Sequence, residues 1–96
     1  MRQIERDMLA AIRQRVDFYK DNTAVVFSDH VGNPHLDGTV YLHGHSIAEV
    51  LPDGAFEINT DTLQEWPTKA TVSRLRALGF DVRIKNGVPL VNGVAL

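Results

Sequence analysis

The stretch WPTKATVSRLRALGF, residues 66–80, predicts a short helix with well-defined ends, around which the rest of the chain can be arranged. Pro67 lacks a backbone N–H and disfavours helical angles in the residue before it, so the helix starts after this proline. Thr68 is the expected N-cap, because its hydroxyl can accept a hydrogen bond from the backbone N–H three residues on. Gly79 follows where a left-handed residue ends a helix at little cost. We therefore predict a helix over residues 69–78.

The same helix has one apolar face. Val72, Leu75 and Leu78 are spaced three residues apart, so their side chains form a single stripe. Few other apolar side chains are available in this helix. We therefore expect Trp66, directly before it, to act as an anchor that is largely buried against a sheet.

The polar residues of this helix and of the strand after it suggest a binding surface. In the structural interpretation, Arg74 and Arg76 lie near the helix C-terminus, where positive charge is favoured by a few tenths to about 1 kcal/mol. In the functional interpretation, one outward surface meets an anion or an acidic partner. Its residues are Lys69, Ser73, Arg74, Arg76, Arg83 and Lys85.

Length and composition restrict the class of protein. Ninety-six residues predict one domain, and 44% hydrophobic with 23% charged residues is typical of a soluble globular protein. No run of about 20 apolar residues occurs, so we expect no membrane-spanning helix and no membrane partner. The N-terminus lacks the apolar core of a secretory signal. The absence of cysteine excludes disulfides, thiolate catalysis and cysteine zinc sites, and is consistent with a cytoplasmic protein.

The net charge of −2 conceals an uneven distribution. Residues 1–68 carry five Lys/Arg and eleven Asp/Glu, a balance of −6, whereas residues 69–96 carry five Lys/Arg and one acid, a balance of +4. A bipolar chain of this kind can steer a charged partner towards one end.

The segments before residue 66 predict a helix followed by an antiparallel meander. Apolar residues recur every four positions over residues 1–18, which predicts an amphipathic helix. Runs of β-branched and aromatic residues follow, separated by turn-forming residues. The predicted strands are 23–28, 39–43, 46–51 and 55–59. Residues 59–65 form a connector that can include one helical turn before Trp66. Gly44-His45 is the expected centre of a type II′ turn.

The segment after residue 78 predicts a hairpin. Residues 80–85 alternate apolar and charged side chains, and Asn86-Gly87 is the strongest turn signal in the chain. Residues 88–91 are expected to pair with residues 80–85. Pro89 is expected at a sheet edge, because proline has no backbone N–H to donate to a neighbouring strand.

The predicted architecture is therefore α+β, with an N-terminal helix, an antiparallel β-meander, a second short helix and a C-terminal β-hairpin in a single domain, residues 1–96. The core of this fold is expected to contain Ile4, Met8, Ile12, Val16, Val26, Leu42, Ile47, Phe56, Ile58, Trp66, Val72, Leu75, Leu78, Val82 and Ile84.

Four histidines between residues 30 and 45 invite a metal-site interpretation, because imidazoles and nearby carboxylates are metal ligands. Their spacing matches no closed ligand set. A turn centred on Gly44-His45 would also place the last two histidines on different faces. We therefore expect no metal and no cofactor at His30, His35, His43 and His45.

Sequence signatures of catalysis are absent. Ser28, Asp29 and His30 are neighbours, but adjacency in sequence is not the geometry of a catalytic triad. The chain has no Gly-x-Ser-x-Gly motif, no phosphate-binding glycine loop and no dinucleotide fingerprint. We expect a protein that is not an enzyme.

A nucleic-acid-binding module is the alternative function. Helix 69–78 is basic, and the hairpin 80–91 follows it in the manner of a wing. A helix-turn-helix, however, needs another helix packed within a few residues, and Trp66-Pro67 leaves little room for one. The chain also lacks the general basicity of DNA-binding domains.

Several short motifs cover most of the chain: Asn22-Thr23-x-Val25, Val40-Tyr41-Leu42-His43-Gly44 with Ile47-Ala48, and Trp66-x-Thr68 followed by Thr71-x-Ser73-Arg74-Leu75-x-Ala77-Leu78. Together they resemble a family of small uncharacterised proteins of bacteriophages, prophages and mobile elements. This resemblance implies no established activity, catalytic residue or cofactor. It does imply a context, since small phage proteins often bind and inhibit a host protein, anti-CRISPR proteins among them. Binding of a host protein in the host cytoplasm is therefore the leading functional hypothesis.

Overall fold

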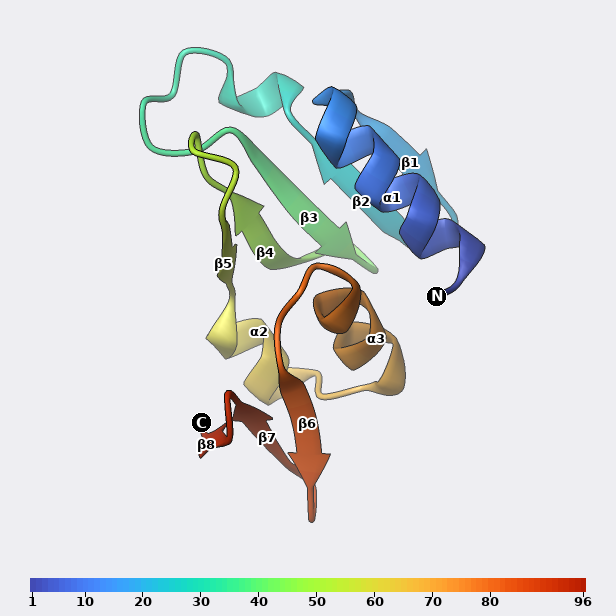
Figure 1. Cartoon of the computed structure of the whole chain (residues 1–96), viewed down its shortest axis with the longest axis vertical. Helices are drawn as coiled ribbons and strands as arrows, with labels where there is room; N and C mark the ends of the chain where they lie inside the picture. Colours follow the sequence, from blue (N-terminus) through green and yellow to red (C-terminus); the bar gives the residue numbers. More distant parts are fainter.

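A five-stranded antiparallel sheet organises the chain in the computed structural model, which describes all 96 residues (Figure 1). Each strand pairs with the next one in the sequence, so the predicted meander is confirmed. A second, three-stranded antiparallel sheet follows at the C-terminal end. The strands are β1 (Phe18–Lys20), β2 (Thr23–Val26), β3 (Gly38–Leu42), β4 (His45–Val50), β5 (Phe56–Ile58), β6 (Val82–Lys85), β7 (Val88–Val91) and β8 (Val94–Ala95).

Three helices cover one face of the five-stranded sheet. They are α1 (Gln3–Gln14), α2 (Thr60–Glu65) and α3 (Lys69–Ala77), and a short 3-10 helix, η1 (Ser28–His30), follows β2. None of these helices is long and apolar enough to span a membrane. All three contribute side chains to one apolar core, which confirms the predicted α+β class. The buried members of this core are Met8, Val25, Val40, Leu42, Ile47, Ala48, Val50, Leu63, Val72, Leu75, Leu78 and Val82.

A β-bulge in β4 sets which side chains enter this core. Val40 of β3 pairs with Ala48, but the next residue, Tyr41, pairs with Ser46, so Ile47 is the extra residue. A bulge of this kind turns its two residues to the same side. Ile47 and Ala48 are accordingly both buried under the helices.

The ends of α3 are those predicted from the sequence. The backbone N–H of Thr71 donates to Thr68 Oγ1 at 3.2 Å, so Thr68 is the N-cap. Gly79 has a φ of 105°, a left-handed value that glycine adopts without a Cβ penalty. The helix ends at Ala77, one residue earlier than predicted.

Two predictions at the N-terminal end are wrong. The first helix ends at Gln14 instead of residue 18, because Arg15 adopts a left-handed conformation (φ 54°) that breaks the helical path. The chain then forms β1 (Phe18–Lys20), a strand that was not predicted from the sequence. Val16 consequently lies outside the helix and is 47% exposed, not buried.

The turn between β3 and β4 is also shifted by one residue from its prediction. Its central residues are His43 and Gly44, with φ values of 52° and 79°, and His45 already belongs to β4. Two positive φ values define a type I′ turn, whose twist matches the flanking strands. The confirmed turn at Asn86-Gly87 has the same pattern of φ values.

Pro89 does not lie on an edge strand, contrary to the prediction, since β7 runs between β6 and β8. The register explains why it is tolerated. Lys85 and Val88 close the two-residue turn, so the next pair, Ile84 with Pro89, has its backbone groups directed away from the partner strand. On the other side, the ladder with β8 ends at Leu90, and Pro89 lies one residue beyond it.

Trp66 is not the buried anchor that the sequence suggested. Its side chain is 44% exposed, while Leu63 of α2 is fully buried in the core. Residues 60–65 are helical, and this brings Leu63 into the core and leaves Trp66 at the rim. There the indole stacks on the His45 imidazole, with ring centroids 5.2 Å apart.

We therefore expect Trp66→Ala to lower the free energy of unfolding by only about 1–2 kcal/mol, roughly half the effect of removing a fully buried side chain. Urea denaturation followed by far-UV circular dichroism measures this difference. Leu63→Ala is the matched comparison and should cost more. A larger loss for Trp66→Ala than for Leu63→Ala would contradict the placement of the two side chains.

Candidate functional site

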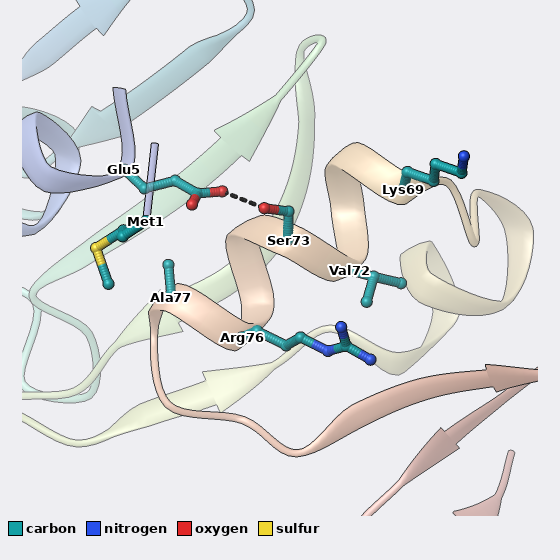
Figure 2. A pocket seen from close by; sticks show the side chains of 7 residues that line it. All are labelled: Met1, Glu5, Lys69, Val72, Ser73, Arg76 and Ala77. Atoms are coloured by element: carbon teal, nitrogen blue, oxygen red, sulfur yellow. Dashed lines mark hydrogen bonds between the residues drawn. The ribbon is translucent and has the colours of Figure 1, made fainter. Parts of the chain in front are cut away.

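The outer surface of α3 holds the part of the predicted binding surface that the structure brings together. A shallow hollow of about 380 Å³ lies between this helix and the start of the chain (Figure 2). Three of the six predicted site residues, Lys69, Ser73 and Arg76, line it. The other lining residues are Met1, Glu5, Val72 and Ala77.

Arg74 is not part of this outward surface, which corrects the prediction. Its side chain is buried, with the residue only 2% exposed. Its Nη1 donates to Glu5 Oε2 at 2.7 Å, and its Nε donates to Thr23 Oγ1 at 3.1 Å. The arginine therefore ties α3 to α1 and β2, and it is unavailable to a partner.

Glu5 is the residue of this region that was not predicted from the sequence. It is buried and accepts hydrogen bonds from both Arg74 and Ser73. A signal for this was present, because Glu5 precedes Met8 by three residues and Ile12 by seven, the spacing of one helix face.

The chemistry of Glu5 indicates a structural carboxylate. Burial raises its pKa, but hydrogen bonds from Ser73 and Arg74 outweigh burial, and the pKa is lowered from its usual value. Ser73 Oγ donates to Glu5 Oε2 at 2.6 Å, as Figure 2 shows. A serine next to a carboxylate resembles a nucleophile and its base, but a carboxylate of lowered pKa is a weak general base.

The three remaining predicted site residues have different environments. Arg76 Nε donates to the Val82 carbonyl at 2.8 Å, so its side chain joins α3 to β6 while also lining the hollow. Arg83 forms an exposed ion pair with Asp81 at 3.2 Å. Lys85 lies at the end of β6 and is exposed. Arg83 and Lys85 thus belong to the second sheet and do not line the hollow beside α3.

The four histidines have different partners. His30 Nε2 lies 2.8 Å from Thr39 Oγ1, His43 Nε2 lies 3.4 Å from Asn22 Nδ2, and His45 stacks on Trp66. His35 lies in the exposed loop after η1. The structure places no three histidine, aspartate or glutamate side chains together in a group that could hold a metal ion.

Asp17 is a second carboxylate with a lowered pKa, and it holds the junction between β2 and η1. The Ser28 hydroxyl donates to it at 2.5 Å and the Phe27 backbone N–H at 2.7 Å, and these bonds lower its pKa.

We expect the free energy of unfolding to be nearly constant from pH 7 to about pH 5 and to fall below about pH 4. The folded-state pKa values of Glu5 and Asp17 lie below their unfolded values, so the stability they contribute is present above the unfolded pKa. It is lost as the pH falls through the folded pKa. Urea titrations between pH 7 and 2.5 measure this, and Asp17→Asn should make the acid branch less steep. A curve for Asp17→Asn that parallels the wild type would count against the assignment.

Comparison with models of known protein families gives a match over nearly the whole chain. The family model described as Kyanoviridae Gp96 protein matches residues 1–95 of the chain. No curated protein and no solved structure matches the chain.

Proposed function

The chain belongs to the Kyanoviridae Gp96 family of phage proteins, and on that premise we propose that it is a non-catalytic module that binds and inhibits a protein of the host cell. The contact surface in this proposal is the outer face of α3, and the site of action is the host cytoplasm. Inhibition of a defence protein, as by an anti-CRISPR protein, is the specific form of this proposal.

The observation that carries the proposal is the mixed character of the α3 surface. Two cations, Lys69 and Arg76, lie beside the apolar side chains of Met1, Val72 and Ala77 around one hollow. Met1 is 66% exposed. Protein interfaces combine apolar contact with a polar rim in this way, and they favour arginine over other charged residues. An acidic segment with an apolar residue would match this surface.

Binding of nucleic acid, the alternative, is disfavoured by the position of Arg74. With this side chain buried and Arg83 paired with Asp81, the basic segment 69–96 keeps only Lys69, Arg76 and Lys85 to neutralise phosphates. Affinity for duplex DNA depends on the number of such neutralised phosphates. The first 68 residues, with their balance of −6, would also repel a polyanion.

Affinity capture from a nuclease-treated host lysate tests the proposal, with Lys69→Glu as the decisive variant. Lys69 is exposed and makes no hydrogen bond or ion pair with another side chain, so its reversal should leave the fold intact. We expect the amount of captured partner to fall about fivefold or more, as loss of a charge contact at an interface implies. Lys85→Glu changes the net charge equally on the second sheet, and it should capture as much partner as the wild type.

A DNA-binding measurement separates the two functions. In fluorescence anisotropy with labelled duplex and single-stranded DNA, we expect no binding at micromolar protein concentration. Micromolar binding whose log affinity falls with log salt at a slope of about −0.9 per neutralised phosphate would favour the nucleic-acid alternative. In the lysate capture described above, equal amounts of partner bound by the wild type and by Lys69→Glu would exclude the α3 surface as the contact.

A further inference from the structure

The face of the five-stranded sheet opposite the helices carries a second, larger hollow. Tyr19, Ala24, Tyr41 and Ser46 form one cross-strand row through the registers of β1 to β4. The buried core and the helices that contribute to it lie on the other face. The short helix η1 covers part of this face, because His30 Nε2 lies 2.8 Å from Thr39 Oγ1 and both Val26 and Thr39 are buried. The hollow measures about 620 Å³, and the Tyr19 side chain beside it is 69% exposed.

Two carboxylates and one ammonium are the charged groups that line this hollow. Asp21 and Asp29 line it, and neither forms an ion pair within the chain. Lys20 also lines it, but its ammonium lies 3.4 Å from Asp7 of α1, which partly neutralises it. The imidazole of His43 also lines the hollow.

Two further carboxylates on the same face repel each other. Glu49 of β4 and Glu57 of β5 are directly paired in the register. Like charges placed directly opposite on neighbouring strands are destabilising. No lysine or arginine of the chain forms an ion pair with either one. A positive charge supplied from outside would relieve this repulsion.

We propose that this sheet face, outside the part that η1 covers, is a docking surface for a lysine- or arginine-bearing segment of a partner protein. The carboxylates would pair with the cations, and the phenol rings of Tyr19 and Tyr41 would offer faces for cation–π contact. The surface is distinct from the α3 face, so this inference does not depend on the proposed function. Its negative charge excludes nucleic acid and anionic membranes as occupants.

The span of the surface indicates a peptide segment and not a single small cation. From the turn between β1 and β2 to β5 the sheet crosses three to four strand spacings, about 15–19 Å at about 4.8 Å each. An extended chain covers this distance with about five or six residues.

Titration of ¹⁵N-labelled protein with a 12-residue peptide of alternating lysine and glycine tests the inference by NMR. We expect chemical-shift changes at Tyr19, Ala24 and Tyr41 and none along α3. A peptide of alternating glutamate and glycine should cause no change. Glu49→Gln/Glu57→Gln should weaken binding about fivefold or more, since charge contacts are lost. Asp61→Asn/Glu65→Gln removes the same charge from exposed positions of α2 and should bind within about twofold of wild type.

A thermal melt distinguishes binding from a structural role of the two glutamates. Because their repulsion disappears, Glu49→Gln/Glu57→Gln should melt at a higher temperature than the wild type. Tyr19→Ala should weaken peptide binding without lowering the melting temperature, since its ring is exposed. Shifts that map elsewhere, no shifts, or a lower melting temperature for the double glutamine variant would overturn the proposal. Sedimentation showing that copies of this chain occupy the face would overturn it as well.

Discussion

Replacing Arg74 by methionine is expected to lower the free energy of unfolding by about 3–5 kcal/mol, the effect of leaving a buried charge without its partner. Arg74 and Glu5 are both buried, and their side chains are 2.7 Å apart. Without the guanidinium, the Glu5 carboxylate keeps only the Ser73 hydroxyl and a long 3.4 Å bond from the Arg2 backbone. A loss of this size is a large fraction of the stability of a small domain. Urea denaturation at pH 7 measures it.

The double variant Glu5→Gln/Arg74→Met is the control for this prediction. Replacing both members of a buried ion pair by uncharged side chains is often nearly neutral, so the double variant should recover most of the lost stability. Arg83→Met removes an arginine from an exposed pair and should change the free energy by less than about 1 kcal/mol. A double variant as unstable as Arg74→Met would show that the loss does not come from the unpaired carboxylate.

Leu75→Ala is expected to lower the free energy of unfolding by about 2–5 kcal/mol, because it empties a fully buried site in the core. Ile84→Ala should lower it by less than about 1.5 kcal/mol, since this side chain is 39% exposed. Both residues belonged to the core expected from the sequence. The pair therefore tests the placement of Ile84 outside the core that contains Leu75 and Val82.

The measurement is again urea denaturation, with the slope of the unfolding free energy against urea compared among variants. An unchanged slope shows that the two variants unfold the same amount of surface. Equal losses for Leu75→Ala and Ile84→Ala would mean that β6 packs more tightly on the core than the structure shows.

The candidate site was only partly predictable from the sequence. Lys69, Ser73 and Arg76 do lie around one hollow, because their spacing along α3 puts them on neighbouring parts of the helix surface. The separation of Arg83 and Lys85 from that hollow could not be foreseen, since it depends on how the second sheet docks. The cross-strand row of Tyr19, Ala24, Tyr41 and Ser46 was not predicted, because the sequence did not indicate β1.

Local chemistry decided the elements that the sequence determined by itself. The start and end of α3 follow from a capping hydroxyl at Thr68 and a left-handed glycine at Gly79. The Asn86-Gly87 turn and the order of the meander follow from turn residues and short alternating runs. Each of these signals acts within a few residues, so it can be read from the chain alone.

Tertiary contacts decided the rest. Arg74 is buried because Glu5, 69 residues away in the sequence, supplies the charge that makes burial tolerable. Leu63 of α2 is buried in the core while Trp66 lies exposed at its rim, and Ile47 is buried because a bulge turns it inward. Residue types restrict such outcomes only weakly, since the free energy of burying a side chain depends on the partners that the fold brings to it.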